Sequence, residues 1–166
     1  LEIIPLYVES NMHYYRTYVK VHKRPDQREN LGYVTQCKNC GHRKIMLEKN
    51  TNCELCNSKN NIAGTLWIDK IFDKEFVEQM ILKSSELTID KACEKALSKC
   101  LAESEMPGMY FTLDEIASRM KSSPPKLEDA INKLQNNGFI ASSTSFSPTG
   151  FRTDANIKEI ITVISD

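Results

Sequence analysis

Two Cys-x-x-Cys pairs constrain this chain more than any other feature. Cys37 and Cys40 form the first pair, Cys53 and Cys56 form the second, and twelve residues separate the pairs. This spacing is typical of a four-thiolate zinc site, because each pair can form a tight turn that directs both sulfurs at one point. Four unrelated buried cysteines, or two redox pairs, are the alternatives. Paired spacing inside one polar stretch favours zinc.

The residues that follow each pair agree with this interpretation. Gly41 and Asn57 are residue types that tolerate the left-handed backbone at the exit of a tight turn. Four sulfur ligands complete a tetrahedron and leave no position for a water molecule. The sequence therefore predicts a structural Zn²⁺ cofactor and not a catalytic one. Cys93 and Cys100 lie outside the set, on the apolar stripe of an expected helix, and are interpreted as small core residues.

The charge of the chain is balanced overall but uneven along its length. Lys plus Arg and Asp plus Glu each number 22, which argues against a purely electrostatic nucleic-acid binder. Residues 1–60 hold ten basic and six acidic side chains, whereas residues 61–105 hold six and nine. An anionic partner is therefore expected to prefer the N-terminal part of the chain.

The first half of the chain indicates strands. Residues 1–11 have no clear pattern, whereas residues 12–24 are aromatic and β-branched, as strands usually are. Within residues 12–24, one expected face is buried and the other is basic and partly aromatic. The buried face holds Tyr15, Thr17, Val19 and Val21, and the other holds Arg16, Tyr18, Lys20 and His22. This strand could pair with a second one at 31–36 through a polar connection at 25–30, which includes Arg28. Further strands are expected at 43–47 and 64–68, giving a small sheet held at one end by zinc.

The middle of the chain indicates helices. Asp73 can cap a helix whose apolar positions include Phe76 and Val77, and Thr88 is the expected cap of a second helix. The second helix has an apolar stripe at a period of 3.6 residues, which includes Cys93 and Cys100.

The last sixty residues predict a compact helical unit with a hairpin. Thr112 and Glu115 have the spacing of a capping box, and a second helix is expected after Ser123-Pro124-Pro125. That helix should stop at Asn137-Gly138 with a left-handed cap. A β-hairpin then extends to Thr153, and Asp154 is expected to cap the last helix. A short strand, two helices and a hairpin in this order are typical of a winged helix-turn-helix.

Together these patterns predict an α+β fold with three parts. They are a strand-rich zinc-binding subdomain with a zinc-ribbon-like antiparallel sheet (1–72), a helical connector (73–106) and a winged-helix-like subdomain (107–166). No Gly-x-Gly occurs among the six glycines, so the usual dinucleotide, S-adenosylmethionine and phosphate loops are not expected. His13, His22 and His42 do not have the spacing of a catalytic or metal set. No apolar run is long enough for a membrane span, and the reduced thiols suit a cytoplasmic protein.

Several segments taken together resemble a known family. They are Tyr14-Tyr-Arg-Thr-Tyr-Val-Lys-Val21, the Gly64-Thr-Leu-Trp67 segment after the cysteine pairs, and Phe146-Ser-Pro-Thr-Gly-Phe-Arg-Thr-Asp-Ala155. In this order they resemble the C-terminal domain of the tRNA (guanine-26-N2)-dimethyltransferase family, over nearly the whole chain. The resemblance implies a parent enzyme whose N-terminal domain binds S-adenosylmethionine and methylates a tRNA guanine. It also implies that this chain lacks that domain, so no catalytic or cofactor-binding residue is expected here. The first residue, which is not methionine, agrees with a domain taken from a longer protein.

The resemblance makes tRNA and the methyltransferase domain of the same protein the expected partners. The candidate phosphate contacts are Arg16, Lys20 and Lys23 on the first basic strand, Arg43 and Lys44 beside the first cysteine pair, and Arg152 in the hairpin. Two other interpretations remain open. One is a zinc-ribbon and winged-helix module that binds proteins of the transcription or RNA machinery. The other is an enzyme that acts alone through a site that these patterns do not reveal.

Overall fold

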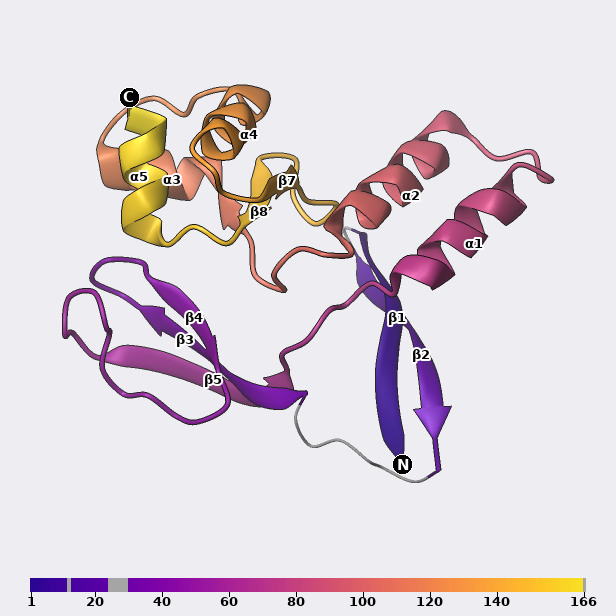
Figure 1. Cartoon of the computed structure of the whole chain (residues 1–166), viewed down its shortest axis with the longest axis horizontal. Helices are drawn as coiled ribbons and strands as arrows, with labels where there is room; N and C mark the ends of the chain where they lie inside the picture. The colour runs from indigo at the N-terminus through magenta and orange to yellow at the C-terminus, as the bar shows by residue number, and fades with distance from the viewer. Residues whose placement is uncertain (12, 24–29, 166) are drawn as a thin grey trace.

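The computed structural model describes residues 1–11, 13–23 and 30–165, and Figure 1 shows how their helices and strands are arranged. The strands form three small antiparallel sheets, and the five helices of the described residues all begin after residue 73. The mixed α and β composition that the sequence predicts is therefore confirmed. The predicted connection at 25–30, with Arg28, lies outside the described residues except for its last position.

The chain begins with a β-hairpin, of which the sequence indicated only the second strand. β1 (Glu2–Asn11) pairs antiparallel with β2 (Tyr14–His22), and the register shifts between Pro5 and Tyr7. The sequence had made no prediction for residues 1–11, and the suggested pairing of the basic strand with the strand at 31–36 was wrong. Pro5 obscured the strand pattern, yet a two-stranded sheet consists of edge strands, where proline is tolerated.

The second sheet carries the cysteine pairs. β3 (Leu31–Cys37) is its central strand, and β4 (Arg43–Met46) and β5 (Asn60–Trp67) pair with it on either side. Two apolar clusters occur among the described residues, and both draw their buried members from outside this sheet. The sheet therefore depends for its stability on its loops and its neighbours more than on a core of its own.

Two helices follow and pack on the hairpin. α1 (Lys74–Ser84) is capped by Asp73 as predicted, because the Asp73 carboxylate accepts a hydrogen bond from the Phe76 backbone N–H. α2 (Lys91–Glu103) is capped by Asp90 and not by Thr88, since Asp90 accepts from the Cys93 backbone N–H. Tyr7 of β1 is buried with apolar side chains of the helical part: Phe72, Val77, Leu97 and Cys100. Cys100 is thus a core residue, whereas Cys93 is exposed, so its predicted burial was wrong.

The packing groups the hairpin with the helices, although the predicted division at residue 72 placed the hairpin with the zinc-binding sheet. In Figure 1 the hairpin adjoins one end of the helix pair, while the β4–β3–β5 sheet lies beside the C-terminal unit. None of the helices described here has the length and apolar character that crossing a bilayer requires.

The C-terminal unit contains the elements in the predicted order. β6 (Phe111–Thr112) precedes α3 (Leu113–Met120) and α4 (Leu127–Asn136), and β7 (Ala141–Ser143) and β8 (Gly150–Thr153) form the hairpin. β8 is the central strand of the β6–β8–β7 sheet, and α5 (Ile157–Ser165) closes the unit. Twelve buried apolar side chains from these elements and their connections form its core.

The ends of these helices test the capping predictions. Thr112 accepts a hydrogen bond from the Glu115 backbone N–H, and Gly138 after α4 has φ +86°, both as predicted. α4 begins at Leu127, later than the prolines suggested. The cap of α5 was predicted too early in the chain. Asn156 accepts from the backbone N–H groups of Lys158 and Glu159, whereas Asp154 accepts from the Ile140 N–H.

Candidate metal centre

The structure brings the four predicted cysteine sulfurs together. The ligand atoms of Cys37, Cys40, Cys53 and Cys56 all lie within 4.8 Å of one another. The Sγ atoms of Cys37 and Cys56 are 3.5 Å apart, as are those of Cys40 and Cys53. Sulfurs about 2.3 Å from a tetrahedral Zn²⁺ would be about 3.8 Å apart, so the donor set fits this ion in type, number and spacing.

The two cysteine turns have the same backbone hydrogen bonds. In the first turn the Gly41 N–H donates to the Cys37 carbonyl, and in the second the Asn57 N–H donates to the Cys53 carbonyl. Gly41 and Asn57 have φ values of +81° and +56°, which confirms the expectation for both turn exits. A Cβ at Gly41 would also lie 2.3 Å from Cζ of Arg119, so a larger residue would displace that guanidinium, but the backbone conformation is what favours glycine there.

The thiols differ in how readily they ionise. Burial raises the pKa of Cys40 to about 12. Hydrogen bonds from the Ser58 hydroxyl and backbone lower the pKa of the half-buried Cys56 to about 5, and the Asn39 amide adds to this effect. A divalent cation between the sulfurs would stabilise all four as thiolates, because a coordinating thiol is deprotonated.

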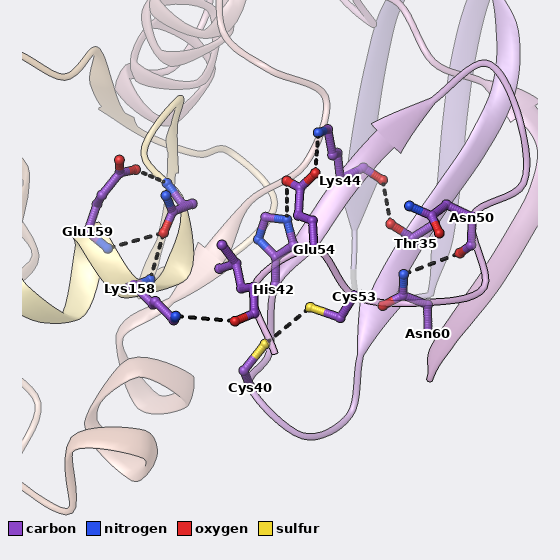
Figure 2. Close-up of polar contacts among 12 residues, drawn as sticks. Thr35, Cys40, His42, Lys44, Asn50, Cys53, Glu54, Asn60, Lys158 and Glu159 are labelled. Atoms are coloured by element: carbon purple, nitrogen blue, oxygen red, sulfur yellow. Dashed lines mark hydrogen bonds and ion pairs between the residues drawn. The ribbon is translucent and has the colours of Figure 1, made fainter. Parts of the chain in front are cut away.

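A second layer of polar contacts joins the two turns (Figure 2). Glu54 lies between the cysteines of the second turn, and its carboxylate contacts His42 Nε2 at 3.0 Å and Lys44 Nζ at 2.5 Å. The lysine hydrogen bond is the largest cause of the lowered pKa of Glu54. Sequence patterns missed Glu54, although its place inside the second Cys-x-x-Cys pair was a usable signal.

Arg43, a predicted phosphate contact, instead joins the metal sheet to the C-terminal unit. Its guanidinium donates at 2.7 Å both to the Tyr110 carbonyl and to the carboxylate of Glu115 on α3. The side chains of Arg43 and Glu115 are each 20% exposed, and the guanidinium also lies over the Phe111 ring. These contacts occupy the side chain, so the structure corrects the expectation for Arg43.

Two further contacts attach the cysteine turns to the same unit. Arg119 of α3 donates to the Asn39 carbonyl in the first turn, and Lys158 of α5 donates to the Leu55 carbonyl in the second. Figure 2 shows Lys158 reaching the second turn from the α5 side. The Leu55 side chain packs against the apolar core of the C-terminal unit. Each turn is therefore docked through a peptide carbonyl whose position depends on the metal-binding loop.

We expect Arg43→Ala to destabilise the protein by about 1–2 kcal/mol. The substitution removes two hydrogen bonds of a cation, each strong when buried and weaker at partial exposure. Urea unfolding measures the change, and Arg43→Lys should recover part of it because one of the two acceptors stays within reach. If Arg43→Lys lost as much tRNA affinity as Arg43→Ala, and neither variant lost stability, this role of Arg43 would be contradicted.

Arg152 is enclosed in the fold and does not face an RNA. The whole residue is 2% exposed, and its Nε donates at 2.6 Å to Glu103, whose side chain is fully buried. Nη1 of Arg152 donates to the Pro107 carbonyl at 2.7 Å. A guanidinium held in this way cannot reach a phosphate, so the structure also corrects the expectation for Arg152.

The remaining predicted cations lie at the surface. Lys20 and Lys23 are exposed, and neither has an ion pair within the described part of the chain. Arg16 is 53% exposed at its side chain and pairs with Glu9 at 2.7 Å. Lys44 is 46% exposed and pairs with Glu54. Arg16 and Lys20 lie on the β1–β2 sheet, whereas Lys44 lies on the β4–β3–β5 sheet that carries the cysteines.

The architecture and the cysteine cluster together are typical of one class of protein. It is a mixed α and β protein in which a small antiparallel sheet, closed by four cysteines fit for zinc, is docked on a helical unit. Residues 1–165 match the sequence profile of the family described as N2,N2-dimethylguanosine tRNA methyltransferase, and the chain belongs to this family.

Individual relatives agree with the family match. The tRNA (guanine(26)-N(2))-dimethyltransferase of Methanothermobacter thermautotrophicus is 33% identical over 165 residues, covering 94% of this chain and 43% of the relative. The enzyme of the same name from Methanosphaera stadtmanae is 31% identical over 172 residues, covering 97% and 44%. Trm1 from Pyrococcus horikoshii, solved with S-adenosyl-L-methionine, superposes with a TM-score of 0.76 at 26% identity, covering 97% of this chain and 43% of that one. The chain therefore spans less than half the length of the relatives it matches.

Proposed function

We propose that this chain is the tRNA-binding C-terminal part of an S-adenosylmethionine-dependent tRNA (guanine-26-N2)-dimethyltransferase. The observation that carries the proposal is the family match over residues 1–165, combined with the shorter length of the chain than its relatives. Methyl transfer and S-adenosylmethionine binding would reside in the remaining part of the full-length protein. The missing Gly-x-Gly in the sequence agrees with this division of roles.

Within this function the cysteine cluster has a structural role. We assign Cys37, Cys40, Cys53 and Cys56 as ligands of one Zn²⁺ that completes a zinc-ribbon-like sheet. The order of β6, α3, α4, β7 and β8 supports a winged-helix-like C-terminal unit. Lys133, the lysine within α4, donates to the Ile164 carbonyl and so serves the fold. Direct RNA contact by α4 is therefore less well supported than contact by the β1–β2 hairpin.

The hairpin cations are the proposed phosphate contacts. Lys20 on β2 and Lys23 just after it are exposed, and Arg16 lies on the same strand with Glu9 as a competing partner. Lysine and arginine side chains that neutralise phosphates release condensed counterions from the RNA. Affinity should therefore fall steeply as the salt concentration rises, and Lys20 and Lys23 should contribute more than Arg16.

The double variant Lys20→Gln/Lys23→Gln should bind an unmodified tRNA transcript more weakly than the parent chain. We expect the slope of log K against log salt to fall by about 2, since each phosphate that a lysine neutralises contributes about 1 to the slope. Filter binding or fluorescence anisotropy across a salt series measures this slope. The matched control is Lys91→Gln/Lys95→Gln, which removes two exposed lysines from α2.

The two pairs of variants separate a hairpin site from a general charge effect. Equal slopes for both would contradict phosphate binding by the hairpin. A parent chain that binds no tRNA even at low salt would contradict the proposed function of this part. Tight binding to a protein of the RNA machinery in its place would favour the interaction-module interpretation.

A further inference from the structure

The two faces of the β1–β2 hairpin differ in chemistry. Directly opposite residues of paired strands share a face, so the register assigns every side chain to one side. One face holds Arg16, Tyr18 and Lys20, and it includes Tyr7, which is buried against Phe72. Within the two strands, the opposite face has no charged side chain. We call it the apolar hairpin face, and its main members are Ile3, Val8, Tyr15, Thr17, Val19 and Val21.

The apolar hairpin face has no cover among the described residues. Tyr15 is 76% exposed, Ile3 and Val21 are each 56% exposed, and Val19 is 39% exposed. The sequence predicted the β2 members of this face to be buried, because Tyr15, Thr17, Val19 and Val21 alternate with more polar residues along the strand. Figure 1 shows the hairpin extending away from α1 and α2, with the N-terminus at its far end. A contiguous exposed apolar face is unusual on a protein that has no partner there, and it usually marks an interaction site. A two-stranded sheet is also only marginally stable unless it packs against another element.

We propose that the apolar hairpin face packs against the remaining part of the full-length polypeptide, the part that relatives possess outside the residues matched here. This inference rests on the proposed function, in which that part performs methyl transfer. The relatives have more than half of their length outside the match, which is ample for a domain of its own. An RNA backbone would not select this face, because its strand residues offer no cation for a phosphate.

The placement of the two faces gives the hairpin a specific role. Val19 and Val21 point to the apolar side, while Lys20 between them points to the opposite side, as alternation along a strand requires. A hairpin anchored through its apolar face would therefore hold Lys20 at a set position relative to the methyl-transferring part. A change in this interface should alter where a tRNA lies on the enzyme.

Hydroxyl-radical footprinting of the full-length polypeptide, without tRNA, tests the proposed interface. Tyr14 and Tyr15 are adjacent tyrosines on opposite faces, with exposures of 43% and 76% here, so each serves as a control for the other. From these exposures alone, Tyr15 should be modified faster than Tyr14. If the apolar hairpin face is covered, the order reverses, and we expect Tyr15 to react at least about threefold more slowly than Tyr14, as for a side chain in a desolvated interface core.

Other outcomes would overturn the inference in recognisable ways. Faster modification of Tyr15 than of Tyr14 would mean that nothing covers the face. Protection of Tyr15 that appears only when tRNA is added would assign the face to RNA. Protection that rises with protein concentration, together with a doubled mass in light scattering, would assign it to a second copy of the chain. Because the main measurement contains no tRNA, a loss of tRNA affinity would defeat the proposed function without changing this result.

Discussion

The substitution Cys53→Ser is expected to unfold the β4–β3–β5 sheet and to detach it from the C-terminal unit. A structural zinc site of this kind supplies an apparent folding free energy of about 10–16 kcal/mol in zinc-finger peptides. The sheet has no apolar cluster of its own within the described residues that could compensate for this loss. The carbonyl groups that Arg119 and Lys158 bind lie inside the cysteine turns, so these docking hydrogen bonds should disappear when the metal is removed.

Metal analysis and circular dichroism together measure this effect. The parent chain should contain about one zinc per chain, as four ligands at one centre require. Cys53→Ser should contain far less and should lose part of its strand signal. Cys93→Ser is the matched control, because Cys93 is exposed on α2 and distant in sequence from the cluster. A zinc content well below one in the freshly purified parent, or unchanged folding of Cys53→Ser, would contradict the structural role.

The substitution Glu103→Ala is expected to cost about 3–5 kcal/mol of unfolding free energy, because it leaves the Arg152 guanidinium buried without its carboxylate. The Glu103 side chain ends α2 with no exposed area, and three donors converge on it. They are Arg152 Nε at 2.6 Å, the Thr144 hydroxyl at 2.6 Å and the Ser145 backbone N–H at 2.5 Å. The loss should also loosen the segment between β7 and β8, whose start is held by two of these bonds.

Urea or thermal unfolding measures the loss, and the chain offers two comparisons. Glu105 lies two residues after Glu103, and its exposed carboxylate pairs with Lys70. Glu105→Ala should therefore change stability little. The double variant Glu103→Leu/Arg152→Met should recover part of the stability, because an apolar pair of similar volume avoids an unpaired buried charge. Similar losses for Glu103→Ala and Glu105→Ala would contradict the role assigned to the buried pair.

Local patterns predicted those features whose causes are local. The spacing within each Cys-x-x-Cys pair, the positive φ values of Gly41 and Asn57, and the caps at Asp73 and Thr112 all depend on residues within about five positions of one another. Where two polar residues were equally good local candidates, prediction failed by a few positions. Asp90 caps α2 in place of Thr88, and Asn156 caps α5 in place of Asp154.

The basic side chains could not be assigned from local patterns. Arg43 and Arg152 carry the same charge in the sequence as Lys20 and Lys23. The difference lies in partners distant in the chain, Glu115 for Arg43 and Glu103 for Arg152. A cation is available to RNA only when the fold leaves it in water, and this depends on which carboxylates tertiary packing brings near. Charge counts along the chain contain no such information.

The cysteine cluster, the order of the C-terminal elements and the family could be predicted from the residues, because these depend on spacing and on order. The pairing of β1 with β2, the burial of Arg152 and the lack of cover over the apolar hairpin face within the described part of this chain depend on the folded structure. The alternation of Tyr15, Thr17, Val19 and Val21 records that one side of a strand avoids water. The pattern does not identify the surface that packs against this side, because burial is a property of the whole assembled structure.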